Sequence, residues 1–183
     1  EYTDQYVLIG GVAATLVMEG AGLEFRATKD LDVVLVVEML DAAFVKRFWE
    51  FIEAGQYEIR QFTPDKPRRY RFAKPAKADY PFMLELFSRQ PDGVELGGEA
   101  TLTPVPVDEA VSSLSAILMD KEAYGFLLEG RIEIDGLRLI NADRLIPLKA
   151  SAWLDLRARA ERGEKIDAKD VRKHLNDVFR LSQ

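Results

Sequence analysis

The most informative part of the chain is the stretch Thr28-Lys29-Asp30-Leu31-Asp32-Val33-Val34-Leu35-Val36-Val37. Its β-branched apolar run is typical of a buried strand, with two carboxylates at its head. Since side chains alternate along a strand, Asp30 and Asp32 point to one face and Leu31 to the other. Two like charges on one face repel each other, so the pair predicts either a bound cation or side chains solvated at the strand end. Mg²⁺ is the cation expected, because it takes oxygen ligands from one or two carboxylates together with substrate phosphates.

A second pattern lies upstream of this strand. Tyr6 to Ile9 predicts a short strand that ends at Gly10-Gly11, and Val12 to Met18 predicts a helix directly after it. Glycines at such a turn let the backbone approach a ligand closely, and the start of a helix favours phosphate. A glycine pair at a turn is common, so it indicates a phosphate site only in combination with the Asp-x-Asp strand. Together the two patterns predict phosphates at the helix start, bridged by metal to the carboxylates.

The pattern of hydrophobic-Gly-Gly, helix, Arg26-x-Thr28-x-Asp30-Leu31-Asp32 and strand resembles the nucleotidyltransferase superfamily that includes DNA polymerase beta. More narrowly, it resembles the AbiEii-type nucleotidyltransferases of type IV toxin–antitoxin systems. The resemblance implies a third carboxylate on a later strand, and Glu85 within Phe82-Met83-Leu84-Glu85-Leu86-Phe87 fits that place. The alternative for Glu85 is an edge or solvent-facing position, because alternation sets it beside large apolar side chains where an unpaired charge is costly.

AbiEii-type relatives also carry a Lys followed about two dozen residues later by Lys-Asp. Lys149 in Leu145 to Ala150 and Lys169-Asp170 match that pattern. The resemblance implies that Lys149 contacts the nucleotide phosphates and that Asp170 completes the site. The structural alternatives are a Lys149 that extends from an apolar helix and an Asp170 that suits the dipole of the last helix, with Asp167 as its N-cap.

The activity implied is Mg²⁺-dependent nucleotidyl transfer. One ion would be held by Asp30, Asp32 and the triphosphate of an NTP, and a second would be shared with Glu85. Gly10 and Gly11 would cradle phosphates, and Lys149 would neutralise developing charge. Arg26 is expected either to bind triphosphate or to form a structural ion pair. Thr28, a further candidate nucleotide-binding residue, is expected to fix the turn before the strand.

The resemblance further suggests a toxin that modifies RNA, at a tRNA end, under the control of a separate antitoxin protein. A second interpretation is transfer to a small molecule, as in antibiotic-modifying relatives of the superfamily. A third is a catalytically inactive nucleotide-binding module, which a Glu85 facing away from Asp30 and Asp32 would favour.

Composition sets outer bounds on these interpretations. The chain has 183 residues, 48% hydrophobic and 31% charged, with a net charge of −6 that argues against a general nucleic-acid coat protein. No apolar stretch reaches the length of a membrane span. The absence of cysteine excludes disulfides and thiolate metal sites and fits a cytoplasmic protein. With His174 as the one histidine, a zinc site or a histidine-based triad is not expected.

Two basic clusters depart from the acidic average. Residues 66–77 hold six basic side chains and no acidic one, interleaved with Tyr70 and Phe72. This cluster predicts either a grip on RNA or an exposed hairpin kept soluble by charge. Residues 157–173 mix basic and acidic side chains, which is typical of a solvated helix face.

The predicted fold class is α/β (α+β): a nucleotidyltransferase-like mixed sheet flanked by helices at residues 1–105, then a mainly helical part at 106–183. The core also contains an amphipathic helix at 40–54, ended by Gly55, and strands at 57–62, 69–72 and 82–87. The C-terminal part is predicted to begin with a helix at 111–119, followed by a hairpin at 131–140 that turns at Asp135-Gly136. A second helix, capped by Asn141, and a third at 167–181 complete it.

Overall fold

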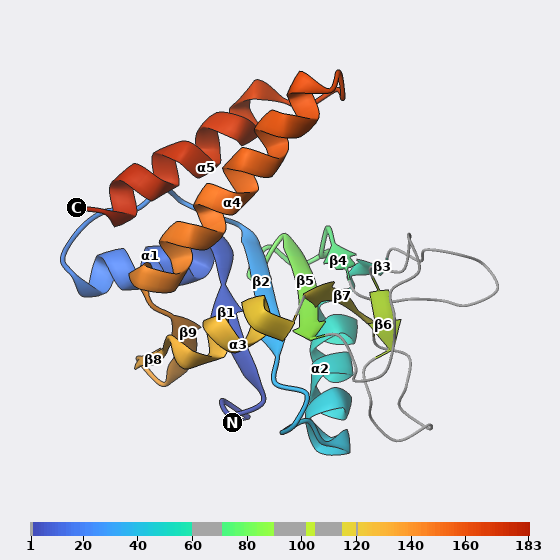
Figure 1. Cartoon of the computed structure of the whole chain (residues 1–183). Helices are drawn as coiled ribbons and strands as arrows, with labels where there is room; N and C mark the ends of the chain where they lie inside the picture. Colours follow the sequence, from blue (N-terminus) through green and yellow to red (C-terminus); the bar gives the residue numbers. More distant parts are fainter. Residues whose placement is uncertain (1, 60–70, 90–101, 105–114, 120) are drawn as a thin grey trace.

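A computed structural model of the chain describes residues 2–59, 71–89, 102–104, 115–119 and 121–183. These residues form a mixed α/β fold, as predicted, in which one twisted sheet is flanked by helices (Figure 1). The helices are α1 (Gly10–Gly20), α2 (Ala42–Gly55), α3 (Lys121–Glu129), α4 (Ala142–Glu161) and α5 (Ala168–Leu181). The strands are β1 (Tyr6–Ile9), β2 (Asp30–Leu35), β3 (Glu58–Ile59), β4 (Arg71–Ala73), β5 (Met83–Arg89), β6 (Leu102–Pro104), β7 (Ser115–Met119), β8 (Arg131–Ile134) and β9 (Leu137–Ile140).

The centre of the sheet brings together the strands that carry the predicted site. The strand order is β3-β4-β5-β2-β1-β9-β8, with β7 paired to β5 and β6 paired to β7. Strand β2 is antiparallel to β1, where Asp32 lies opposite Ile9, and parallel to β5, where Asp32 lies beside Glu85. The Asp-x-Asp strand therefore lies between the strand that leads to the glycine pair and the strand that carries the third acid.

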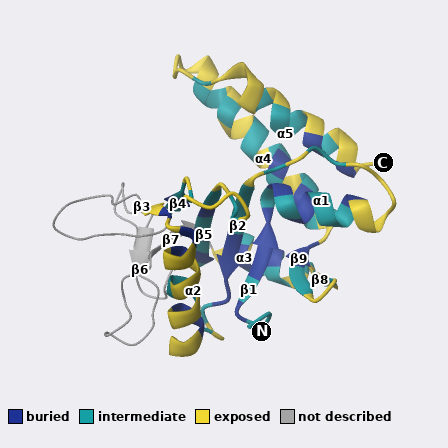
Figure 2. Cartoon of the chain, turned by 180° about the vertical axis from the view of Figure 1, so that it is seen from behind, coloured by how far each residue is buried: buried dark blue, intermediate teal, exposed yellow. Residues whose placement is uncertain are grey.

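Alternation along β2 gives the sheet two chemically different faces. Leu31 and Val33 point away from Asp30 and Asp32, toward the face that α2 covers. There Phe44 stacks on Tyr6, and a T-shaped contact joins Phe48 and Phe72 across 5.4 Å between ring centroids. Phe72 is fully buried, and the strands at the centre of the sheet form the core (Figure 2). This apolar packing fixes the sheet from one side and leaves the opposite face for the carboxylates.

The helix α2 follows its predicted boundaries closely. Asp41 is its N-cap and accepts a hydrogen bond from the Phe44 amide at 2.7 Å, and Gly55 is its last residue. Phe44, Phe48 and Ile52 pack in the core as expected. The helical spacing of the sequence also predicts a core position for Phe51, and this is wrong: Phe51 is 38% exposed and contacts Tyr57 and Tyr80.

The predicted hairpin is confirmed as β8 and β9. Asp135 and Gly136 both have positive φ, 51° and 74°, as a type I′ turn requires. Strand β9 then pairs in parallel with β1 through Leu139 and Leu8. Strands from both sides of the predicted boundary near residue 105 therefore belong to one sheet.

The helix predicted at 111–119 is wrong where the structure describes it. Ser115–Met119 is strand β7, parallel to β5 and antiparallel to β6, whereas 111–114 lie outside the described residues. A short apolar run is compatible with either a helix or a strand. Here the part of the β5 edge that extends beyond β4 pairs with this run, which therefore forms a strand. The helix of this region, α3, begins at Lys121 instead.

The two C-terminal helices lie side by side and project from the sheet at the end near α1 (Figure 1). Asn141 caps α4, and Asp167 caps α5 by accepting a hydrogen bond from the Lys169 amide at 2.8 Å, as predicted. Gly163 follows the end of α4 with φ +87°. None of the helices in the described ranges is both long enough and apolar enough to cross a lipid bilayer.

Candidate functional site

Two of the predicted acids lie on one face of β2, and the third lies on the neighbouring strand. Asp30 and Asp32 are two residues apart, and Glu85 of β5 is in register with Asp32 across a parallel pair. Residues in register on neighbouring strands point to the same face of the sheet. The structure therefore places Asp30, Asp32 and Glu85 on one face of the sheet.

The glycine pair is in close contact with this acidic face. Gly10 has φ +69°, and a Cβ placed on it would come within 1.9 Å of Asp32 Oδ2. A Cβ on Gly11 would come within 2.7 Å of the hydroxyl of Thr28. Both glycines are thus required by close approach, and Gly10 also by its left-handed backbone. The start of α1 is set directly against the head of β2, with Thr28 in the contact.

Asp32 is held in surroundings that oppose its negative charge. Burial, together with the neighbouring carboxylates of Glu85 and Asp30, raises the pKa of Asp32 to about 6. The ammonium groups of Lys173 and Lys149 act in the opposite direction and lower it in part. A carboxylate with these neighbours gains most from a ligand that brings positive charge.

Glu85 has a partner that the sequence did not indicate. Arg71 of β4 lies opposite Glu85 in the antiparallel β4–β5 pair, and its guanidinium contacts the Glu85 carboxylate through Nε and a terminal nitrogen. The Glu85 side chain is 14% exposed. Arg71 therefore balances the third acid, while Lys149 and Lys173 of the C-terminal helices act on Asp32.

The carboxylates of Asp30 and Asp32 fit Mg²⁺ as a partial ligand set that substrate phosphates and water would complete. Among the described residues, no three His, Cys, Asp or Glu side chains are grouped so as to hold a metal ion by themselves. Mg²⁺ usually keeps only one or two protein carboxylates and completes its octahedron with water and substrate phosphates. Asp30 and Asp32 match that requirement at a helix start, where a phosphate would meet free backbone N–H groups.

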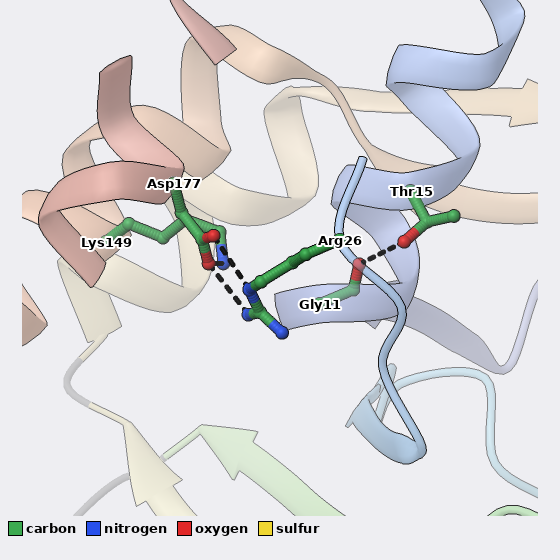
Figure 3. A network of polar contacts seen from close by, with 5 residues as sticks. All are labelled: Gly11, Thr15, Arg26, Lys149 and Asp177. Atoms are coloured by element: carbon green, nitrogen blue, oxygen red, sulfur yellow. Dashed lines mark hydrogen bonds and ion pairs between the residues drawn. The ribbon is translucent and has the colours of Figure 1, made fainter. Parts of the chain in front are cut away.

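A buried ion network joins three parts of the chain (Figure 3). Arg26, in the segment before β2, donates from Nε and Nη2 to the two oxygens of Asp177 on α5, both at 2.8 Å. Lys149 of α4 donates from Nζ to Asp177 Oδ2 at 2.7 Å. Asp177 is fully buried and Lys149 is 5% exposed. One carboxylate therefore holds two cations at the base of the helical pair.

The charges of this network are unequal. Burial alone raises the pKa of Asp177, but hydrogen bonds from Arg26 and Lys149 outweigh it and hold that pKa below its usual value. Burial lowers the pKa of Lys149, and its bond to Asp177 restores only part of the loss. Burial next to Lys149 and Lys173 also lowers the pKa of His174. The network carries more positive than negative charge, and its Lys149 lowers the pKa of Asp32.

The sequence predicted roles for Lys149 and Arg26 and placed Arg71 in a basic cluster, but Asp177, Lys173 as a site residue and the pairing between Arg71 and Glu85 were not predicted. Asp170, predicted to complete the site, lies exposed in the first turn of α5. Asp177 is seven residues further on the same helix face and takes the buried position instead. The sequence did contain an indication that Asp177 is buried, since it lies four residues before the apolar Leu181 and so shares the inward side of an otherwise polar helix.

The two basic clusters have different positions. Of residues 66–77, those up to 70 lie outside the described residues, and further along Lys74 pairs with Glu58 at 3.1 Å. In the cluster at 157–173, Arg157 and Arg159 form exposed ion pairs with acids of the same region, Glu161 and Glu164. Those pairs support the solvated-face interpretation for the part of the cluster near the end of α4.

A cavity of about 550 Å³ lies on the opposite face of the sheet from the carboxylates. It is lined by apolar side chains of the sheet and α2, among them Leu8, Leu31, Val33, Phe48 and Leu84. Because Leu31 and Val33 alternate with Asp30 and Asp32, this cavity does not open onto the acidic face.

Comparison with known proteins adds no family to this description. No family model matches the chain, and no curated protein matches it in sequence.

Replacement of Gly10 by alanine tests the contact between α1 and β2. Gly10→Ala is expected to lower the free energy of unfolding by about 1–3 kcal/mol, because it forces a side chain into a left-handed backbone and against Asp32. Urea denaturation measures the change. The matched control is Gly20→Ala in the same helix, where the added Cβ would make only an ordinary van der Waals contact with Ile134 Cδ1 at 3.7 Å, so that stability should stay equal or rise slightly. Equal stability of both variants would contradict the close approach.

Neutralisation of Asp32 tests its electrostatic surroundings. Since the folded-state pKa is raised to about 6 from 3.8, ionised Asp32 opposes folding above pH 6 and ceases to do so as it is protonated. Asp32→Asn should therefore be more stable than the wild type by about 1–3 kcal/mol at pH 7, and the difference should shrink as pH falls from 6 to 4. Urea denaturation across this range, without divalent cations, measures it. A difference that does not vary with pH would contradict the raised pKa.

Proposed function

We propose that the chain is a Mg²⁺-dependent nucleotidyltransferase that moves an NMP group from an NTP to a hydroxyl acceptor. The observation that carries the proposal is the position of Asp32. Its carboxylate lies against the glycine start of a helix, beside Asp30 and Glu85, and opposite the cations of α4 and α5. A phosphate ligand that carries a divalent cation suits this position, because its phosphates can bind the helix start and the lysines of α4 and α5 while its cation binds the carboxylates.

In this proposal Asp30 and Asp32 hold Mg²⁺, with Glu85 as the nearest further carboxylate. Bound there, the metal would act as a Lewis acid and neutralise charge on the reacting phosphate. The backbone at Gly10 and Gly11 would bind phosphate oxygens, and Lys149 would stabilise negative charge on the triphosphate. Thr28 would keep the turn before β2 packed against Gly11.

The contact between Arg71 and Glu85 distinguishes the active from the inactive interpretation. Glu85 faces the same side as Asp32, which supports an active site. Its carboxylate is nevertheless occupied by Arg71, so use of Glu85 as a second-metal ligand or as a base for the acceptor hydroxyl requires this pair to open. A nucleotide-binding module without activity is the second candidate, and it is favoured if the pair stays closed with nucleotide bound.

On the basis of the resemblance to AbiEii-type enzymes, we propose RNA, at a tRNA end, as the acceptor. The same resemblance suggests control by a separate antitoxin protein. A reaction that consumes NTPs and RNA is proposed for the cytoplasm. The net charge of −6 instead supports a small-molecule acceptor. The two acceptors can be separated by experiment.

Asp30→Asn and Asp32→Asn should each reduce Mg²⁺-dependent NTP turnover by more than about 100-fold, since loss of outer-sphere partners of metal ligands already costs about 10–100-fold. Release of pyrophosphate from each of the four NTPs measures turnover. Asp155→Asn on α4, an exposed acid with a loose ion pair to Arg159 at 3.7 Å, is the matched control and should keep full activity. Equal turnover in the wild type and both site variants would remove the proposed activity.

The acceptor is identified by the fate of labelled nucleotide. The protein is incubated with each α-labelled NTP and Mg²⁺, together with either total RNA or a mixture of aminoglycosides. Label in RNA that is lost after ribonuclease treatment supports the RNA acceptor, and label in the small-molecule fraction supports the alternative. Label in neither fraction, despite nucleotide binding, favours the inactive module.

A further inference from the structure

Asp177 is a buried acid that the proposed chemistry does not use directly, yet it contacts both Arg26, in the segment before β2, and Lys149 of α4. It is fully buried within α5, and it accepts three hydrogen bonds from Arg26 and Lys149 at 2.7–2.8 Å. A carboxylate without partners in this position would be costly, whereas the bonds that it accepts also fix the two cations. Asp177 therefore determines where two positive groups lie.

The two cations keep donors for a second anion. A guanidinium has five N–H donors and an ammonium three, and Asp177 takes two from Arg26 and one from Lys149. Lys173, four residues before Asp177, lies on the same face of α5 and acts electrostatically on Asp32 more strongly than Lys149 does. Arg26 and Lys149 thus share one buried acid, and Lys149 and Lys173 both act on Asp32.

We propose that Asp177 is a positioning residue of the nucleotide site: it holds Lys149 and Arg26 so that, together with Lys173, they form one binding site for the triphosphate of the incoming NTP. This inference rests on the proposed function and assigns the phosphates to these residues. The site is opposite the glycine start of α1, so that the triphosphate would lie between backbone N–H groups on one side and cations on the other. Asp30 and Asp32 would hold the metal on the same phosphates.

The role of Asp177 has a signature in the pH dependence of binding. Lys149 must be protonated to attract phosphate. The groups that act on it are Asp177, His174 and Lys173 of α5, Arg26 before β2, and Asp32 of β2. Of the two acids, Asp177 is the one that accepts a hydrogen bond from Lys149 and so favours its protonated form directly. Without its charge, Lys149 loses its proton at lower pH, so that affinity for triphosphate should fall at lower pH as well.

The experiment measures binding of a non-hydrolysable Mg–NTP analogue by calorimetry from pH 6 to pH 10. Asp177→Asn keeps the size of the side chain and removes its charge. We expect its dissociation constant to rise about tenfold at pH 7 and the alkaline loss of binding to move to lower pH. Asp155→Asn on α4 is the matched control and should bind as the wild type does. Wild-type affinity and pH profile in Asp177→Asn would overturn the inference and leave the proposed function standing.

Circular dichroism shows whether Asp177→Asn folds. If it does not, a second variant tests the triphosphate site. Lys173→Gln replaces a half-buried side chain and is expected to fold and to weaken binding about tenfold. Unchanged affinity in Lys173→Gln would overturn the three-cation site. Failure of the folded wild type to bind any of the four Mg–NTP analogues would overturn the proposed function itself, and this inference with it.

Discussion

The close approach of Gly10 to Asp32 is the constraint on which the rest of the site depends. Strand β1 runs antiparallel to β2 with Ile9 opposite Asp32, so the chain enters α1 directly over this carboxylate. Only a residue without a side chain fits there. The result is an acid that is shielded from water and flanked by other acids, which makes its ionised form costly in the absence of a ligand. The cations of α4 and α5 offset part of that cost.

The parts of the site that lie close together in sequence could be predicted from it. Alternation along a single strand placed Asp30 and Asp32 on one face, and the strand–glycine–helix pattern placed Gly10 and Gly11 beside them. Glu85 was found because a lone acid in an apolar strand is conspicuous. Each of these predictions needed only local periodicity, together with a family resemblance that named the third acid.

The parts that depend on distant contacts could not be predicted in the same way. Arg71 pairs with Glu85 because β4 and β5 are antiparallel in a particular register, and no local pattern fixes that register. Asp177 meets Arg26 across 151 positions of the chain. The strand β7 was mistaken for a helix because its five residues suit both, and pairing with β5 settled the choice. Tertiary contacts, not propensities, decide at these positions.

The central claim is that Asp32 forms a carboxylate site in which a divalent cation replaces a proton. The most direct measurement is a ¹³C NMR titration of the Asp32 carboxyl carbon from pH 3 to pH 8, with and without Mg²⁺ and a non-hydrolysable NTP. We expect Asp32 to titrate near pH 6 without ligands and at distinctly lower pH with Mg²⁺ and the NTP analogue bound. Titration near the ordinary value for aspartate under both conditions would contradict it.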